Sequence, residues 1–202
     1  MNEVNAREDF SLDALRAGDR AEFARLVESH YEMIYRLAIR MVDNPQDAED
    51  ILQETFLKAY RHLKDFDGRS SLSTWLYRIA TNEALMFLRR KRPDQVSIDA
   101  PVESEMDDLE PVQVVDWCCL PENELMSAEA RAHLDQAIGR LPASLRVVFI
   151  LRDIQDLSTR EVSEILNLSE TAVKTRLSRA RLRLREDLTG YYGEKLREGK
   201  RA

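Results

Sequence analysis

The feature that most constrains the fold is a pair of short helices expected between residues 158 and 184. The run Ser158-Thr159-Arg160-Glu161 is a capping box, in which the serine caps a helix and the glutamate reaches back to the serine. This predicts a helix over residues 159–166. Residues 167–169 (Asn-Leu-Ser) predict a turn, and its serine can cap a second helix over residues 170–184.

The apolar residues of this segment recur at helical spacing and would pack the two helices together. They are Val162, Ile165, Leu168, Val173, Leu177, Ala180 and Leu184. A short helix, a turn and a second helix is typical of the helix-turn-helix motif, whose second helix lies in the DNA major groove. The side chains left for the groove are Lys174, Thr175, Arg176, Ser178, Arg179 and Arg181. Arginine can read guanine, serine and threonine bond bases or phosphates, and lysine attracts phosphate. A basic run alone is often only a solvated surface, but the capped helix and the turn before it favour DNA binding.

The net charge of −7 argues against a nucleic-acid partner until its distribution is considered. Residues 93–124 carry ten acidic side chains and no lysine or arginine, whereas residues 174–185 carry six basic side chains and no acid. The acidic stretch also loses helical periodicity and contains Pro101, Pro111 and Pro121, which is typical of a linker. So long a connection is usually functional or disordered, and composition alone does not separate these alternatives.

The rest of the chain predicts helices on both sides of this linker. Amphipathic spacing runs over residues 19–41, a second helix opens at Asn44-Pro45 and reaches about residue 63, and a third follows a polar loop and ends before Pro93. Beyond the linker, helices are expected over residues 124–140 and around residues 147–151. With 44% hydrophobic and 33% charged residues and only six Gly and six Pro, the fold class is all-α. Residues 1–92 and 122–202 would form two small helical domains, joined by an extended acidic linker over residues 93–121.

Catalytic and metal sites are not expected. The chain contains no glycine-rich phosphate loop, His30, His62 and His133 are scattered, and Cys118 and Cys119 are adjacent and most simply two reduced thiols. We therefore expect no cofactor, no metal and no small-molecule substrate. No apolar run is long enough to span a bilayer and the start of the chain lacks the pattern of a signal peptide, which predicts a cytoplasmic protein.

Three motifs in this order resemble regions 2 and 4 of extracytoplasmic-function sigma factors of RNA polymerase. They are Ile51-Leu52-Gln53-Glu54-Thr55-Phe56-Leu57-Lys58-Ala59-Tyr60, Ser73-Thr74-Trp75-Leu76-Tyr77-Arg78-Ile79-Ala80-Thr81-Asn82 and the helix-turn-helix. The resemblance covers about residues 10–92 and 122–190. It implies a factor that binds core polymerase and directs promoter-specific initiation, rather than an enzyme.

The resemblance also implies residue roles. Docking on the clamp helices of the polymerase β′ subunit would fall to Asp47, Asp50, Ile51, Gln53, Glu54 and Phe56, although Ile51, Leu52 and Phe56 could equally belong to the core. Residues 65–71 would form the specificity loop, which holds a base flipped from the melted downstream (minus-10) element. The residues at that strand would be Asp67, Arg69, Ser70, Thr74, Trp75, Arg78 and Asn82, with Arg89, Arg90, Lys91 and Arg92 on phosphates. Trp75 could be a core residue instead of a stacking platform.

The helix-turn-helix would read the upstream (minus-35) element, which in this family often contains AAC. The β flap of the polymerase is a further implied partner, and the acidic linker would thread toward the RNA exit channel. No additional regulatory domain is evident, so an anti-sigma factor, often membrane-bound, is the implied regulator, and it could hold the chain at the inner face of the membrane.

Two other classes of protein remain open from the residues alone. A free-standing regulator with a sensing or dimerising first domain would bind duplex DNA tightly without polymerase. A purely protein-binding helical module, such as an anti-anti-sigma adaptor, would not need the basic side chains of the second helix.

Overall fold

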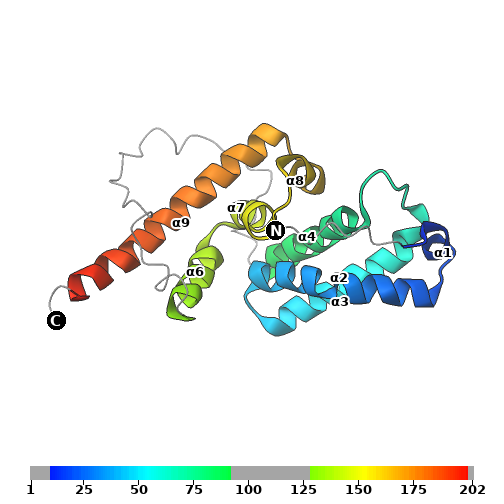
Figure 1. Cartoon of the computed structure of the whole chain (residues 1–202), viewed down its shortest axis with the longest axis horizontal. Helices are drawn as coiled ribbons and strands as arrows, with labels where there is room; N and C mark the ends of the chain where they lie inside the picture. Colours follow the sequence, from blue (N-terminus) through cyan, green and yellow to red (C-terminus); the bar gives the residue numbers. More distant parts are fainter. Residues whose placement is uncertain (1–9, 92–127, 200–202) are drawn as a thin grey trace. The chain divides into compact units, whose positions relative to one another are not determined.

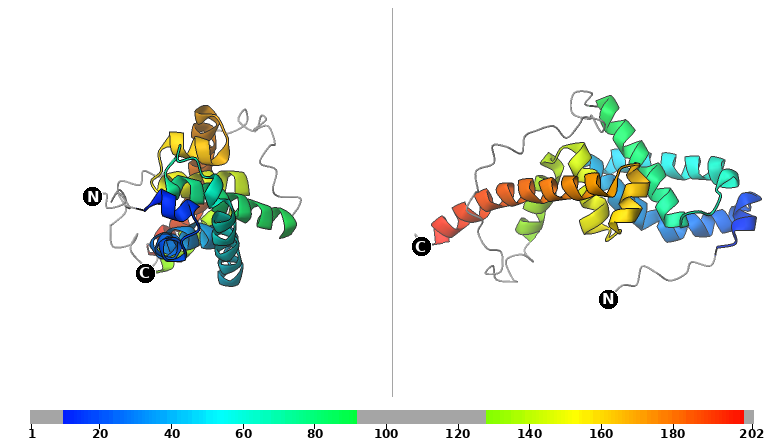
Figure 2. Two further views of the ribbon diagram at one scale, coloured as in Figure 1. Left: turned by 90° about the vertical axis from the view of Figure 1, so that its right-hand side faces the viewer. Right: turned by 90° about the horizontal axis from the view of Figure 1, so that it is seen from above.

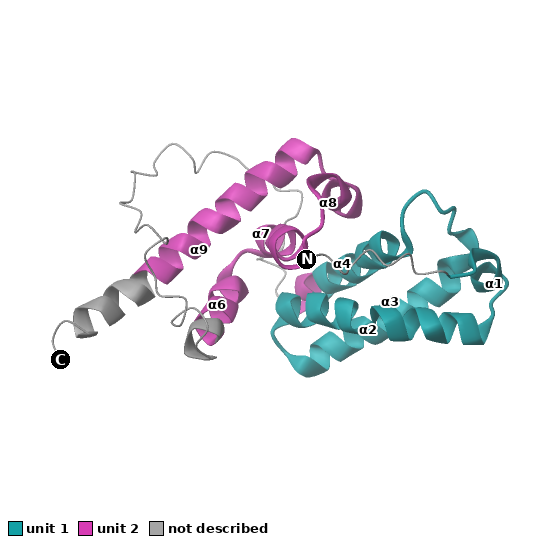
Figure 3. Cartoon of the chain, in the orientation of Figure 1, with its two compact units in different colours: residues 1–87 teal, residues 88–202 magenta. Residues whose placement is uncertain are grey.

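The computed structural model describes residues 10–91 and 128–199, and all regular structure within these ranges is helical, as predicted. The chain divides into two compact units, residues 1–87 and 88–202 (Figure 3). This division falls inside helix α4 (Leu72–Lys91), a few residues before the boundary expected at residue 92. The acidic linker over residues 93–121 and the start of the expected helix at residue 124 lie outside the described residues.

Unit 1 is built on three long helices, α2 (Arg20–Val42), α3 (Pro45–His62) and α4. Helices α2 and α3 lie side by side in opposite directions (Figures 1 and 2). The turn between them needs only two residues: Asp43 adopts a left-handed φ of 58°, and the Asn44 side chain accepts hydrogen bonds from the backbone N–H groups of Gln46 and Asp47 at 2.9 and 3.1 Å. Pro45 occupies the first helical turn, so the predicted helix start is confirmed.

The core of unit 1 consists of apolar side chains from these three helices, at the spacing that the sequence predicted. The most deeply buried are Leu26, Ile34, Leu37, Ala38, Met41, Ala48, Ala59, Leu76, Ala80 and Ala84. Burial of a leucine, isoleucine or methionine side chain contributes about 1.5–3 kcal/mol, and the alanines let the helices approach closely, so this cluster is the main source of stability for the unit.

Two short elements of unit 1 were not predicted. Helix α1 (Leu12–Arg16) is one turn long and is capped by Ser11, and the 3-10 turn η1 (Leu63–Asp65) continues α3 into the polar loop. A five-residue helix is too short to show a periodic pattern, and it persists because Leu15 is buried to 2% exposure.

Unit 2 contains α6 (Ala128–Arg140), α7 (Ala143–Phe149), the π-helical segment η4 (Ile150–Ile154), α8 (Thr159–Leu166) and α9 (Glu170–Gly199). One face of α9 packs against α6 and α7. The residues that form this core cluster are Ala137, Ile138, Leu141, Leu145, Ala180 and Leu184, with Phe149, Ile154 and Leu188 packed against it.

Helix α9 continues to Gly199, well beyond the end expected near Leu184. Leu188 lies one turn beyond Leu184 on the buried stripe and packs on the core cluster. This packing stabilises the helix beyond the expected end. The π-helical segment η4 was also unexpected. Its last turn closes with hydrogen bonds from the N–H groups of Gln155 and Leu157 to the carbonyls of Ile150 and Leu151, at 2.9 and 3.1 Å.

Candidate nucleic-acid interface

Helix α8 begins with the capping box that the sequence predicted. The Ser158 hydroxyl accepts a hydrogen bond from the N–H of Glu161 at 3.2 Å, and the Ser158 N–H donates to the Glu161 carboxylate at 2.8 Å. Two helix-terminal N–H groups are thereby satisfied without solvent. Both ends of α8 agree with the prediction.

The turn between α8 and α9 is equally local. Asn167 takes a left-handed φ of 53°, a conformation that asparagine tolerates better than most residues. The Ser169 hydroxyl accepts a hydrogen bond from the N–H of Ala172 at 3.1 Å and caps α9. These short-range contacts fix where the second helix of the motif begins and the direction in which it leaves the turn.

The buried side of the helix-turn-helix is the predicted one. Val162, Ile165, Val173 and Ala180 are at most 2% exposed, whereas Leu168 is half-buried. This packing fixes one face of α9 against the protein and leaves the opposite face, where DNA is expected to bind, exposed to solvent.

The six polar residues expected to face DNA do not share one environment. Lys174, Ser178 and Arg181 are exposed, and Thr175 and Arg179 are half-buried. The hydroxyl of Thr175 donates to the carbonyl of Thr171 one turn earlier, at 3.0 Å.

The expectation of a groove-facing Arg176 needs correction, because its side chain is only 6% exposed. Residue 176 lies three positions after Val173 and four before Ala180, both of which are fully buried. On an α-helix this spacing places the arginine on the packed side. The charge of the side chain suggested a role that its helical position does not support.

Arg181 is held by an acidic partner that sequence reasoning missed. Its Nε and Nη2 donate to the two carboxylate oxygens of Asp153 at 2.8 and 2.7 Å. The hydrogen bond to Asp153 raises the pKa of the Arg181 guanidinium above its ordinary value. Asp153 lies in η4, so the π-helical segment positions an anion beside the edge of α9 that is expected to face DNA.

The specificity loop of unit 1 is organised by its own polar residues. Gly68 has a φ of +76°, and the Asp67 carboxylate accepts hydrogen bonds from the backbone N–H of Arg69, at 3.1 Å, and from the Arg69 side chain. These two hydrogen bonds lower the pKa of the Asp67 carboxyl from its ordinary value of 3.8. Ser71 ends the loop and accepts from the N–H of Thr74 at 3.0 Å, as a cap of α4 does.

The residues expected at the melted strand fall into two groups. The exposed group consists of Asp67, Arg69, Arg78, Asn82, Arg89, Arg90 and Lys91. Ser70 is half-buried, and Arg92 lies outside the described residues. Thr74 is 5% exposed and its hydroxyl lies 2.8 Å from that of Ser71, so we correct its role to that of a buried structural residue. Trp75 is half-buried, with its ring centroid 5.1 Å from that of Phe66, and therefore combines packing with partial exposure.

The residues expected to dock on polymerase are similarly divided. Asp50 and Gln53 are exposed, and Asp47 and Glu54 are half-buried. Ile51 and Phe56 are 3% and 8% exposed, so they belong to the core, which was the alternative interpretation of these positions. The corrected docking set is polar.

A further residue on this helix was missed by sequence reasoning. The ammonium group of Lys58 lies 2.6 Å from the carboxylate of Glu83 on α4 and 3.8 Å from that of Glu54. The Glu54–Lys58 spacing of four residues was a visible signal for the second contact. Lys58 thus cross-links α3 and α4 and orients one of the carboxylates expected to dock.

The described parts of the chain contain neither a candidate metal site nor a candidate membrane-spanning helix. No group of three or more His, Cys, Asp or Glu side chains among residues 10–91 and 128–199 is placed to share a metal ion. Within the same ranges, none of the helices combines the length and the apolar character that a bilayer crossing requires. Fold and surface together define a two-unit helical protein with a helix-turn-helix in its second unit.

Comparison with known proteins agrees with this class. The model of sigma-70 region 2 matches residues 26–93, and the model of sigma-70 region 4 matches residues 131–184. The chain is 40% identical to the ECF RNA polymerase sigma factor SigW of Bacillus subtilis (strain 168) over 177 residues, which cover 88% of this chain and 94% of that protein. It is 35% identical to the ECF RNA polymerase sigma-E factor of Escherichia coli (strain K12), with 84% and 88% covered.

A similar solved structure is that of the sigma factor RpoE in complex with the anti-sigma factor NepR from Bartonella quintana. The TM-score is 0.59 at 27% identity, with 83% of this chain and 97% of that chain covered. The chain belongs to the extracytoplasmic-function family of RNA polymerase sigma factors. Such proteins are transcription initiation factors and not enzymes, and their two domains bind core RNA polymerase and promoter DNA.

Proposed function

We propose that the exposed edge of α9 reads the upstream promoter element. The observation that carries this assignment is that one edge of α9 is basic and exposed to solvent, whereas the opposite side is a buried apolar stripe. The helix belongs to a helix-turn-helix whose geometry is fixed by local helix caps. Lys174, Ser178 and Arg181 are its exposed members, and Thr175 and Arg179 flank them. Arginine supplies base or phosphate contacts, and lysine supplies phosphate attraction.

In the same proposal, the specificity loop (residues 65–71) and the exposed side of α4 engage the melted downstream element. Arg78 and Asn82 lie one turn apart on α4 and are both exposed. An amide can hydrogen-bond a base edge, and Trp75 retains enough exposure for a base to stack on it. Arg89 and Arg90, at the end of α4, would hold phosphates.

Docking on core polymerase would rest on the acidic and amide side chains of α3. Asp50 and Gln53 are exposed, and Asp47 and Glu54 are partly so, which suits the polar rim of an interface. We also propose that the linker over residues 93–121 threads along the polymerase.

Regulation by an anti-sigma factor is part of the proposal. The solved relative RpoE was captured in complex with the anti-sigma factor NepR, and it shares 27% identity with this chain. We propose that this chain acts in the cytoplasm and that an anti-sigma factor, membrane-bound in one arrangement, sequesters it.

The test is reconstituted run-off transcription with the full chain, core polymerase and genomic fragments. Added chain should produce promoter-specific transcripts that core polymerase alone does not make. Core that gains no such transcript would refute the assignment, and tight, specific duplex binding without polymerase would favour a free-standing regulator.

Variants of α9 then test the reading of the upstream element. Arg179→Ala should weaken discrimination at one position of that element by about 1–3 kcal/mol if it contacts a base. The matched control is Arg160→Ala on α8, which removes an exposed arginine 3.1 Å from Glu164. If Arg179→Ala instead weakens DNA binding equally on all sequences, Arg179 contacts a phosphate.

A further inference from the structure

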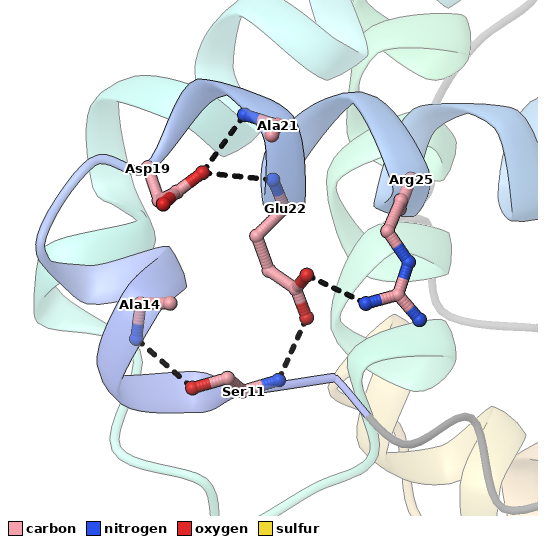
Figure 4. Close-up of polar contacts among 6 residues, drawn as sticks. All are labelled: Ser11, Ala14, Asp19, Ala21, Glu22 and Arg25. Atoms are coloured by element: carbon pink, nitrogen blue, oxygen red, sulfur yellow. Dashed lines mark hydrogen bonds and ion pairs between the residues drawn. The ribbon is translucent and has the colours of Figure 1, made fainter.

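Helix α1 is fixed to the start of α2 by a carboxylate. One oxygen of Glu22 accepts a hydrogen bond from the backbone N–H of Ser11 at 2.8 Å, and the other accepts from Arg25 at 2.7 Å (Figure 4). The Glu22 side chain is only 12% exposed, although its partners Ser11 and Arg25 face solvent. Ser11 is also the cap of α1, and the bond to Glu22 therefore anchors the helix at its first turn.

The two helices are also joined by a tight turn. Gly18 has a φ of +82°, and the Asp19 carboxylate caps α2 by accepting from the N–H groups of Ala21 and Glu22 at 2.8 and 3.0 Å (Figure 4). With Leu15 buried, α1 has a defined position on unit 1 although it is one turn long.

The last residue of α1 holds the backbone of the specificity loop. Nε and Nη2 of Arg16 both donate to the carbonyl oxygen of Phe66, at 3.0 and 2.7 Å. The two N–H groups of the planar, rigid guanidinium converge on this single oxygen, so the side chain of Arg16 holds the Phe66 carbonyl in place. The carboxylate of Asp13 lies 3.9 Å from Arg16 but is fully exposed, so it competes only weakly with the Phe66 carbonyl for the guanidinium.

Contact between α1 and the loop extends to its glycine. A Cβ built on Gly68 would lie 3.8 Å from Nη2 of Arg16 and 3.9 Å from Cδ1 of Leu12. A side chain at residue 68 would therefore be in ordinary van der Waals contact with two α1 side chains, which shows that α1 lies beside this part of the loop. The Asp67–Arg69 hydrogen bonds close the turn between the Phe66 carbonyl and Ser70.

Holding Phe66 also holds the aromatic group expected at the melted strand. The Phe66 side chain is 6% exposed and packs against Trp75, with ring centroids 5.1 Å apart. The start of α4 has a second support, since Nε2 of the buried His30 lies 3.1 Å from the hydroxyl of Ser73. The loop is thus supported at both ends by residues that precede it by more than 40 positions in the sequence.

We infer that Arg16 is a positioning residue for recognition of the downstream promoter element: it fixes the Phe66 carbonyl and, through it, the specificity loop and Trp75. This inference rests on the proposed function of that loop. Helix α1 precedes the matched region, residues 26–93, so it adds an element to the recognition apparatus that the region-2 match does not contain. Arg16 acts through the loop and does not itself contact DNA.

The experiment measures base preference by the complete holoenzyme. Run-off transcription is compared on a promoter and on versions in which each base of the downstream element is replaced in turn. Arg16→Lys keeps the positive charge but loses the two-pronged hydrogen bond, and Arg16→Ala loses both. The matched control is Arg36→Lys on α2, where an arginine 63% exposed pairs with Glu32 over one turn.

Both Arg16 variants should reduce the preference at the base held by the loop by about tenfold, the scale of one lost base contact. Preference at the upstream element and affinity for core polymerase should be unchanged, and Arg36→Lys should retain full preference. Arg16→Lys keeps the test informative if Arg16→Ala fails to fold. Arg16 variants that transcribe less from every template with unchanged base preference would overturn the inference, since they would show a purely structural role.

Arg69→Ala, within the loop, separates this inference from the function on which it rests. Loss of preference in Arg69→Ala together with intact preference in both Arg16 variants would refute positioning by α1 and leave the loop as the reader. Intact preference in Arg69→Ala and in the Arg16 variants alike would remove the reading role of the loop, and the inference with it.

Discussion

The ion pair between Asp153 and Arg181 leads to a prediction in which folding stability and DNA binding change in opposite directions. Asp153→Asn keeps the shape of the side chain but removes its charge and one strong acceptor. The pair is bidentate, at 2.8 and 2.7 Å, and joins η4 to α9. Its removal should loosen α9 while releasing the Arg181 guanidinium at the edge of α9 proposed to face DNA.

The magnitude follows from the exposure of the two side chains. Hydrogen bonds to charged groups contribute about 1.5–3 kcal/mol when sheltered, and exposed ion pairs about 0.2–1 kcal/mol. Arg181 is 55% exposed and Asp153 is 21% exposed, so solvent screens the pair substantially. We expect Asp153→Asn to cost about 1 kcal/mol, equivalent to a roughly fivefold shift in the equilibrium for opening of α9.

The first assay is amide hydrogen exchange of the full chain, because it reports the opening of unit 2 separately from unit 1. Amides in residues 170–184 should exchange about fivefold faster in Asp153→Asn under conditions where the opened state recloses faster than its amides exchange, so that the rate reports the opening equilibrium. Glu164→Gln is the control, since the Arg160 side chain that it pairs with is 82% exposed. That substitution should change exchange by less than about twofold.

The second assay is promoter binding by the holoenzyme at several salt concentrations. Asp153→Asn should bind more tightly at low salt, and the slope of log K against log salt should steepen by about 0.9 if Arg181 gains one phosphate. Weaker binding in Asp153→Asn would contradict competition between Asp153 and DNA. It would show instead that the carboxylate orients Arg181 for its contact.

Three further predictions concern the caps, the core and the specificity loop. Ser158→Ala removes the capping box and should destabilise α8 by about 1 kcal/mol, with Ser158→Asp restoring most of it, as measured by amide exchange. Ile165→Ala, at a position 2% exposed, should cost about 2–5 kcal/mol in denaturant unfolding and abolish upstream-element preference. Because hydrogen bonds from Arg69 lower the pKa of Asp67, its stabilising effect is present above pH 3.8 and is lost as the pH falls through the lowered pKa. The melting-temperature difference between the wild-type chain and Asp67→Asn should therefore shrink as the pH falls from neutral through 3.8 and on through the lowered pKa, and a constant difference would exclude this titration.

The elements that could be predicted from sequence are those set by local chemistry. Asn44-Pro45 and the Ser158–Glu161 capping box each satisfy helix N–H groups within three residues, so the pattern and the structure coincide. Apolar periodicity likewise located the core of α2, α3 and the buried stripe of α9. The end of α9 was missed although Leu188 continues the four-residue spacing of Ala180 and Leu184 and packs on the same core cluster, a local signal that the prediction did not follow.

The candidate site was predicted less completely, because charge was taken as evidence of exposure for Arg176, and roles were carried over from a family resemblance for Ile51, Phe56 and Thr74. Arg176 lies on the packed side of α9, and Ile51, Phe56 and Thr74 are buried in unit 1. Helical spacing from Val173 to Ala180 already places residue 176 on the buried face. For Thr74 the missing information was its contact with Ser71, which depends on the loop conformation.

The contacts beside the two surfaces proposed to bind DNA are the least accessible to sequence reasoning, for a physical reason. Asp153 and Arg181 are 28 residues apart, and the π-helical segment that brings them together has no distinctive composition. Arg16 is 50 residues from Phe66, and its acceptor is a backbone carbonyl, which every residue carries. A side chain that holds a backbone group constrains the identity of only one partner, so no pattern of paired residues reveals it. Substitution of Arg16 is therefore the direct way to learn whether α1 takes part in promoter recognition, because Phe66 cannot be changed to remove its carbonyl oxygen.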